Sequence, residues 1–86
     1  MKIVFTPEAR SDYFFWQHHD QKMVERVNEL IKDIMRTPFF GIGKPEPLRY
    51  EFKGYWSRRI NQEHRLVYYI KDLTLVIISA RFHYDS

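Results

Sequence analysis

The chain has 86 residues, a formal net charge of +3, 44% hydrophobic and 17% aromatic side chains, and no cysteine. This length predicts one domain spanning residues 1–86, and the apolar content argues against an intrinsically disordered chain. The lack of cysteine excludes a disulfide scaffold and a thiol nucleophile and fits a reducing cytoplasm. No apolar run approaches the roughly 20 residues that cross a bilayer, and no signal-peptide pattern opens the chain.

The charge is unevenly distributed along the chain. Residues 1–43 carry six basic and six acidic side chains, whereas residues 44–84 carry eight basic and four acidic ones. The C-terminal half is therefore the side that we expect to meet a polyanion, either a nucleic acid or an acidic protein segment. An excess of this size also occurs in domains that bind neither.

The N-terminal half predicts a short strand and two helices. Residues 2–5 form the strand, and Thr6 followed by Pro7 is typical of a helix start. We expect this helix to end near residue 18 and Asp20 to cap a second helix at residues 21–36, whose apolar side chains recur at helical spacing. That apolar stripe predicts core packing against a sheet rather than a cofactor site.

Residues 39–47 predict the one long loop. Its glycines and Lys44 do not match the GxxxxGK[ST] phosphate-loop spacing, which argues against nucleotide binding. Glu46 lies between Pro45 and Pro47, which exclude it from a helix interior and hold it where a strand begins. Partial burial there would suit this carboxylate to proton transfer; a plain surface turn is the alternative.

The C-terminal half predicts strands. Residues 48–53 alternate apolar and polar side chains, residues 55–69 form a hairpin, and residues 75–84 form a final strand that is apolar on both faces and should lie inside the sheet. The element order is β-α-α-β-β-β-β. The predicted fold class is α+β, with two N-terminal helices packed on one face of a mainly antiparallel sheet of about five strands.

The hairpin carries arginines around its turn. If Ile60 lies opposite Leu66, as the apolar pattern favours, then Arg59, Asn61 and Arg65 project from the opposite face of the sheet. Two fixed cations on one face suit a phosphate group. The alternative is an ordinary solvated outer face.

These residues could together cleave RNA without a metal. The sheet face without helices would collect Arg59, Arg65, Arg81 and His83, and Glu46 would enter from the loop. A carboxylate could take the proton of the ribose 2′-hydroxyl, arginines could stabilise the anionic phosphorane, and an imidazole could protonate the leaving 5′-oxygen. Each residue taken alone is equally typical of an ordinary surface.

Five segments of the chain resemble YoeB-type toxins of the RelE superfamily, and the resemblance covers essentially the whole chain. Two departures from the pattern are the apolar Phe40 and Ile42 in the loop and the extension Asp85-Ser86. The matching segments are residues 36–39 (RTPF), 43–48 (GKPEPL), 56–60 (WSRRI), 63–68 (EHRLVY) and 81–84 (RFHY).

The resemblance implies a toxin of a type II toxin–antitoxin system that cuts messenger RNA in the ribosomal A site, with no metal and no cofactor. By motif match, Glu46 is the general base, His83 the general acid and Arg65 the transition-state stabiliser. Arg49, Arg59 and Tyr84 match supporting substrate-binding positions. The implied partners are the ribosome with its mRNA and an acidic YefM-like antitoxin, which alone contacts operator DNA; no membrane is involved, and a homodimer remains open.

Two other functions remain open on this scaffold. One is a non-catalytic poison of the ParE-like kind, which would not need the set of Glu46, Arg65 and His83. The other is a nucleic-acid-binding module that uses the basic face. A DNA-reading module would favour a helix rich in Arg and Asn, whereas residues 21–36 balance their charges.

Overall fold

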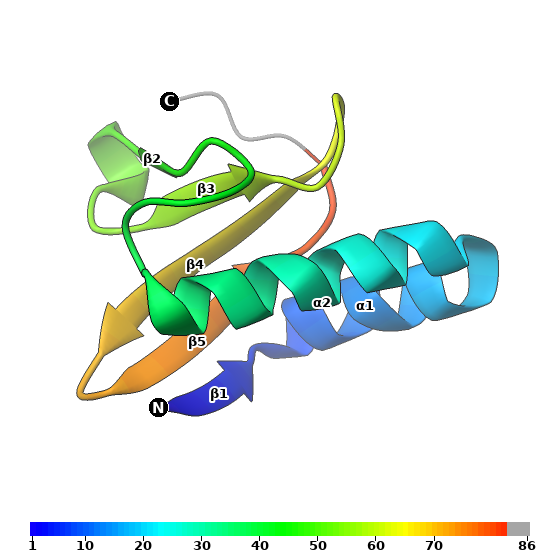
Figure 1. Ribbon diagram of the computed structural model, residues 1–86, viewed down its shortest axis with the longest axis horizontal. Coiled ribbons are helices and arrows are strands. Elements are labelled where there is room, and N and C mark those ends of the chain that lie inside the picture. Colours follow the sequence, from blue (N-terminus) through cyan, green and yellow to red (C-terminus); the bar gives the residue numbers. More distant parts are fainter. Residues whose placement is uncertain (83–86) are drawn as a thin grey trace.

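The structure is a computed structural model and describes residues 1–82. Among these residues, two helices precede most of a five-stranded sheet of order β1-β5-β4-β3-β2, in which only the β1–β5 pair is parallel (Figure 1). This arrangement confirms the predicted α+β class. The elements are β1 (Lys2–Phe5), α1 (Pro7–His19), α2 (Gln21–Arg36), β2 (Glu46–Pro47), the 3-10 turn η1 (Tyr50–Phe52), β3 (Trp56–Arg59), β4 (Arg65–Lys71) and β5 (Thr74–Ser79).

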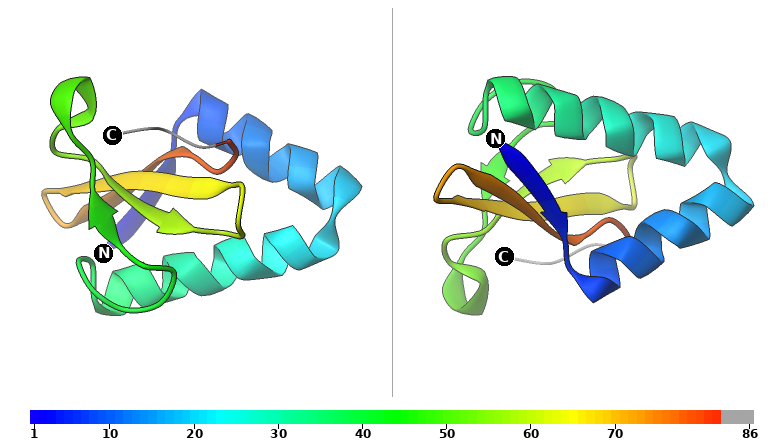
Figure 2. Two further views of the ribbon diagram at one scale, coloured as in Figure 1. Left: turned by 90° about the horizontal axis from the view of Figure 1, so that it is seen from above. Right: turned by 90° about the horizontal axis from the view of Figure 1, so that it is seen from below.

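Local capping fixes the helix ends. The Thr6 hydroxyl accepts a hydrogen bond from the Ala9 amide (3.1 Å), and the Asp20 carboxylate accepts one from the Lys22 amide (3.1 Å). The first helix extends one residue beyond the expected end, and α2 has the expected bounds. The two helices form an antiparallel hairpin and diverge from their connecting turn (Figure 2).

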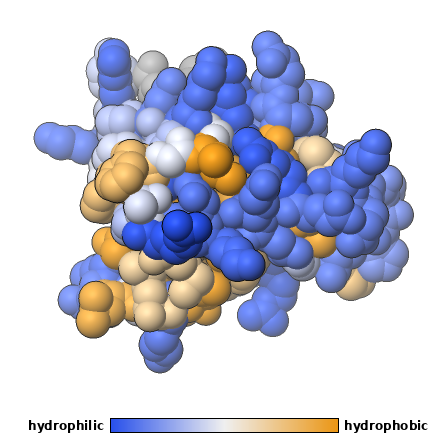
Figure 3. All heavy atoms as spheres, viewed as in Figure 1, coloured by the Kyte–Doolittle hydropathy of each residue, from blue (hydrophilic) through white to orange (hydrophobic). Residues whose placement is uncertain are grey.

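The apolar stripe of α2 packs into the core, as the sequence predicts. Leu30 and Ile34 of α2 are fully buried with Leu66 and Tyr68 of β4 and Leu75 of β5. In contrast to these buried residues, several large apolar side chains of β1 and of the β4–β5 turn remain exposed. They contribute to the apolar surface at the lower left of Figure 3, where these elements lie. None of the helices among residues 1–82 has the length and apolar character needed to cross a membrane.

The expected strand at residues 48–53 is wrong. Strand β2 contains only Glu46 and Pro47, and one further bond, from the Leu48 amide to the Tyr55 carbonyl, precedes η1. Local bonds replace the ladder: the Phe52 amide donates to the Arg49 carbonyl (3.1 Å) and the Lys53 amide to the Tyr50 carbonyl (3.0 Å). Tyr50 has a left-handed backbone (φ 57°) and is 82% exposed, so its side chain does not pack into the core.

The predicted hairpin register is also wrong, by two residues. Leu66 pairs with Arg58 instead of Ile60, and Arg59 pairs with Arg65. A shift of two residues preserves which side chains share a face, so Arg59 and Arg65 still project together from the sheet. Asn61 leaves this face: its side-chain oxygen accepts the amides of Glu63 (2.9 Å) and His64 (2.7 Å) within the turn.

The final strand is shorter than expected and ends at Ser79. It is an interior strand, as predicted, between β1 and β4. Residues 80–82 continue without strand pairing, and the expected strand residues 83 and 84 lie outside the described part of the chain.

Candidate active site

The strand register brings three of the predicted site residues to one face of the sheet. Glu46 pairs with Ser57 across β2 and β3, and Arg59 pairs with Arg65 across β3 and β4. Ser57 and Arg59 are two residues apart on β3, so their side chains point the same way. The core residues of β3 and β4, such as Leu66, point to the opposite face, where the helices pack. Glu46, Arg59 and Arg65 therefore share the sheet face without helices.

Arg65 is held firmly by the β3–β4 turn. Its Nη1 donates to the carbonyl oxygens of Asn61 (2.9 Å), Gln62 (3.2 Å) and His64 (3.2 Å). Burial lowers the pKa of the Arg65 guanidinium, the neighbouring Arg59 cation lowers it further, and the Glu46 carboxylate raises it. An arginine so far from neutral pH stays protonated. Two positive side chains that repel one another thus lie side by side, an arrangement that an anion would stabilise.

Glu46 lies at the start of the edge strand β2, as expected, and is exposed, so it does not have the partial burial that would suit it to proton transfer. Pro47 pairs with Trp56, and the Leu48 amide then donates to the Tyr55 carbonyl (2.9 Å), which keeps this segment beside β3. Glu46 is close enough to Arg65 for their charges to interact. The carboxylate is thus accessible to a substrate and adjacent to the cationic pair.

Arg49 lies three residues beyond Glu46. It precedes η1 and is exposed. Its position on this open segment is compatible with contact to a long polyanion that also reaches Arg59 and Arg65.

Arg58 is a key residue that the sequence analysis missed. Its side chain is fully buried on the helix side of the sheet, where Nη1 lies 2.6 Å from Asp33 Oδ2 of α2. The hydrogen bond from Arg58 and a second one from the Ile42 amide lower the pKa of Asp33. Strand alternation puts Arg58 on the same face of the sheet as Trp56 and Ile60, and this pattern in the sequence could have predicted that its side chain is buried.

The Arg58 guanidinium fixes the loop that leads to Glu46. It donates to the carbonyl oxygens of Thr37 (2.6 Å), Phe40 (3.1 Å) and Ile42 (3.2 Å). The neighbouring Arg59 amide donates to the Gly43 carbonyl (2.7 Å). The apolar Phe40 and Ile42 side chains themselves are exposed, so this loop is held through its backbone.

Arg81 does not join the predicted cationic face. Its guanidinium carbon lies 3.5 Å from the centre of the Phe15 ring of α1 and 4.6 Å from that of Phe82. The expected strand parity of Arg81 fails because β5 has already ended at Ser79. His83, Tyr84 and the extension Asp85-Ser86 lie outside the described residues.

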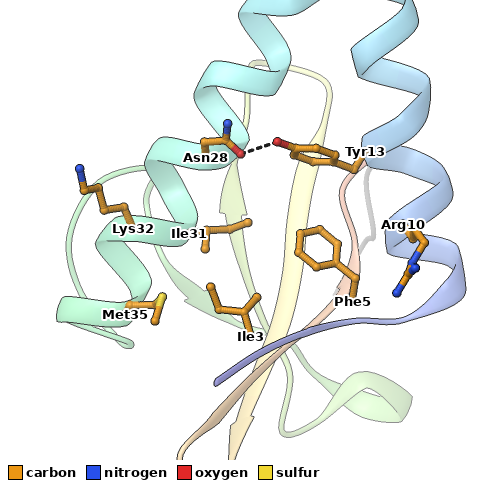
Figure 4. A pocket seen from close by; sticks show the side chains of 8 residues that line it. All are labelled: Ile3, Phe5, Arg10, Tyr13, Asn28, Ile31, Lys32 and Met35. Atoms are coloured by element: carbon orange, nitrogen blue, oxygen red, sulfur yellow. Dashed lines mark hydrogen bonds between the residues drawn. The ribbon is translucent and has the colours of Figure 1, made fainter. Parts of the chain in front are cut away.

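A groove of about 550 Å³ opens on the other side of the sheet, between α1, α2 and β1 (Figure 4). Ile3 and Phe5 form its floor, and a hydrogen bond from the Tyr13 hydroxyl to Asn28 (2.8 Å) closes one end. Ile3 and Phe5 pair with the core-facing residues Leu75 and Ile77, which puts this groove on the helix side. It is therefore separate from the face that carries Glu46 and Arg65.

The family can be read from comparison with known proteins. The family model described as "YoeB-like toxin of bacterial type II toxin-antitoxin system" matches residues 5–84. The chain belongs to this family. Its relatives include a protein named Toxin YoeB from Synechocystis, which is 61% identical over 85 residues covering 99% of both chains.

Solved structures agree with the YoeB-like assignment. The YoeB/ParE toxin from Agrobacterium tumefaciens has a TM-score of 0.95 at 52% identity, covering 98% of this chain and 100% of that one. A YoeB dimer from Staphylococcus aureus has a TM-score of 0.92 at 49% identity, and a YoeB–YefM complex from the same organism has 0.90 at 48%; each comparison covers 98% of both chains. The chain is thus a YoeB-like toxin of a type II toxin–antitoxin system.

Proposed function

We propose that this YoeB-like toxin is a ribosome-dependent endoribonuclease that cuts mRNA in the ribosomal A site and so inhibits translation. The observation that supports this proposal best is the shared sheet face of Glu46, Arg59 and Arg65. A carboxylate beside two guanidinium groups, of which that of Arg65 is held by the β3–β4 turn, supplies a base and an anion-binding site, which are two of the three groups that this reaction needs.

The proposed reaction begins at the ribose 2′-hydroxyl. Glu46 takes its proton while the 2′-oxygen attacks the adjacent phosphorus, and Arg65 stabilises the charge of the phosphorane. His83 gives a proton to the leaving 5′-oxygen. Arg59 holds the phosphate from the neighbouring strand, and we assign supporting contacts with the substrate to Arg49 and Tyr84. No metal or cofactor takes part in this scheme.

The ribosome would supply the alignment of the RNA that the exposed sheet face of Glu46, Arg59 and Arg65 cannot supply alone. Glu46 is exposed and sits on an edge strand, so RNA binding to the toxin alone would not hold the 2′-oxygen in line with the scissile bond. Messenger RNA fixed in the A site arrives with that geometry constrained. Because ribosomes are cytoplasmic, we propose that the toxin acts in the cytoplasm.

We further propose that the partner is an acidic YefM-like antitoxin, which also provides any contact with operator DNA. The support is the Staphylococcus aureus complex of YoeB with YefM. The Staphylococcus aureus YoeB dimer supports a homodimer as a second assembly. An acidic antitoxin segment also suits the basic excess of residues 44–84.

The test is to map new 5′ ends on messages translated in an extract that contains the purified toxin. We expect cuts at codons in the A site with the wild-type chain, and none on the same RNA without ribosomes. Arg65→Ala should cut roughly 10²–10³-fold more slowly, because one preorganised donor to the developing anion is lost. Arg10→Ala, which removes an exposed arginine of α1, should cut at the wild-type rate.

Two results would overturn the proposal. Inhibition of translation without any new 5′ ends would favour a non-catalytic poison of the ParE-like kind. Equal cutting by the Arg65→Ala and Arg10→Ala variants would show that the cationic face takes no part in the reaction.

A further inference from the structure

The segment after β5 is held by side chains from distant parts of the chain. We call residues 80–82 the C-terminal strap. The Ala80 amide donates to Asp12 Oδ2 (2.9 Å), and Trp16 Nε1 donates to the Ala80 carbonyl (2.7 Å). Both partners are buried side chains of α1. Helix α1 therefore fixes the beginning of the strap and turns the chain away from the β5 ladder.

The other end of the strap is fixed by the β3–β4 turn. The Phe82 amide donates to His64 Nδ1 (2.8 Å), and the Arg65 amide donates to the Phe82 carbonyl (2.9 Å). Two consecutive residues, His64 of the turn and Arg65 at the start of β4, thus bind both backbone groups of Phe82. Since Arg65 is the proposed transition-state stabiliser, Phe82 lies next to a residue of the proposed site.

We propose that His64 is a positioning residue for the reaction: by accepting the Phe82 amide it fixes the end of the C-terminal strap against Arg65. This inference rests on the proposed function, and it assigns no contact between His64 and RNA. The strap and the Arg65 side chain are both bound to the β3–β4 turn, so the bond to His64 sets the position of Phe82 relative to the guanidinium. Positioning of this kind changes the rate of a bound complex more than its affinity.

The role requires a particular protonation state of the imidazole. Nδ1 can accept the Phe82 amide only when it carries no proton, so the ring is the neutral form with its proton on Nε2. The ring packs edge-on against Trp16, with 4.9 Å between ring centres, and its side chain is 12% exposed. This packing leaves the imidazole little freedom to satisfy the Phe82 amide in another way.

Two carboxylates and one arginine lie around His64. Glu63 Oε1 of the turn lies 3.6 Å from Nε2, and Asp12 of α1 is near enough to interact with His64 and with Arg81 of the strap. A proton on Nδ1 would meet the Phe82 N–H and break the bond, so only the neutral imidazole can hold the strap.

An isosteric pair of variants tests the inference. In His64→Asn the side-chain oxygen takes the place of Nδ1 and can accept the Phe82 amide without titrating; His64→Leu has the same shape and no acceptor. We expect slow hydrogen exchange of the Phe82 amide in the wild-type toxin and in His64→Asn, and faster exchange in His64→Leu. The rate of cutting at saturating ribosomes should fall roughly ten- to a hundredfold in His64→Leu only, with the affinity for ribosomes unchanged.

The pH profile separates positioning from a general structural role. The wild-type rate should fall at low pH together with the protection of the Phe82 amide, whereas in His64→Asn that protection should persist. Equal Phe82 exchange in His64→Leu and the wild type, or equal cutting rates, would overturn the role of His64. Absence of cutting by the wild-type toxin would instead reject the proposed function, and the exchange measurement would still decide whether His64 holds the strap.

Discussion

Replacement of Arg58 by methionine should destabilise the fold more than any other arginine replacement on β3 or β4. Methionine fills similar space but removes all five hydrogen bonds that the guanidinium donates, including the one to the Tyr68 hydroxyl (3.2 Å). Breaking a buried ion pair by removing one partner costs about 3–5 kcal/mol, because the other charge is left without compensation. The Asp33 side chain is 22% exposed, so water can solvate part of it and the lower end of that range applies.

A loss of about 3 kcal/mol is a large share of the free energy of unfolding of a domain of this size, which is roughly 4–13 kcal/mol. It should lower the melting temperature by about 12–24 °C. The assay is urea and thermal unfolding of the purified toxin, followed by circular dichroism. Arg59→Met is the matched control: it removes the neighbouring arginine on the other face and should change the free energy of unfolding by less than about 1 kcal/mol.

A second variant tests whether the uncompensated Asp33 carboxylate causes the loss. Adding Asp33→Leu to Arg58→Met removes that charge, so the double variant should lose less stability than the sum of the two single variants. A loss below about 1 kcal/mol in Arg58→Met, or strict additivity of the pair, would refute the view that this ion pair holds the loop in front of Glu46.

Three further predictions address the carboxylate of α1, the loop glycine and the proposed acid. Burial raises the pKa of Asp12 above 3.8, although its hydrogen bond from the Ala80 amide lowers it. The folded state therefore binds a proton at Asp12 more readily than the unfolded state, so the free energy of unfolding falls as the pH rises from 3.8 through the raised pKa. Asp12→Asn should abolish this slope in urea titrations at several pH values; an unchanged slope contradicts the assignment. Gly43→Ala should cost about 1–3 kcal/mol in the same assay, because its backbone is left-handed (φ 78°) and a Cβ would lie 2.8 Å from Leu30 Cδ2 and 3.2 Å from the Arg59 carbonyl. Gly54→Ala, which meets nothing within 4 Å, should cost less, and equal losses would rule out the contact as the cause. His83→Gln should abolish mRNA cutting and leave binding of a YefM-like antitoxin nearly intact in a calorimetric titration; strong residual cutting would reject His83 as the acid.

The sequence predicts the helices well because their ends are decided locally. Thr6 and Asp20 act on amides two or three residues away, and the apolar stripe of α2 needs only helical periodicity. The alternation of residues 48–53 is equally regular, yet it is overridden. The last bond to β3 is the one from the Leu48 amide to the Tyr55 carbonyl, and short-range turn bonds then take over the backbone of η1.

The site was predictable in part because strand parity survives a register shift of two residues. Arg59 and Arg65 share a face in either register, whereas the position of Asn61 depends on the turn itself. Burial of Arg58 depends on Asp33, which is 25 residues away, and on carbonyls of a loop whose path the sequence does not specify. The same holds for Arg81, whose place is decided by α1 rather than by the strand before it.

The chemistry of the fragment ends tests the central claim most directly. If Glu46, Arg65 and His83 promote attack by the ribose 2′-hydroxyl, mRNA cut by the wild-type toxin on ribosomes must carry a 2′,3′-cyclic phosphate on one fragment and a 5′-hydroxyl on the next. End-specific ligation and mass spectrometry of the fragments distinguish these ends. Fragments with a 3′-hydroxyl and a 5′-phosphate would mean that water rather than the 2′-hydroxyl attacks the phosphorus, and they would contradict the account.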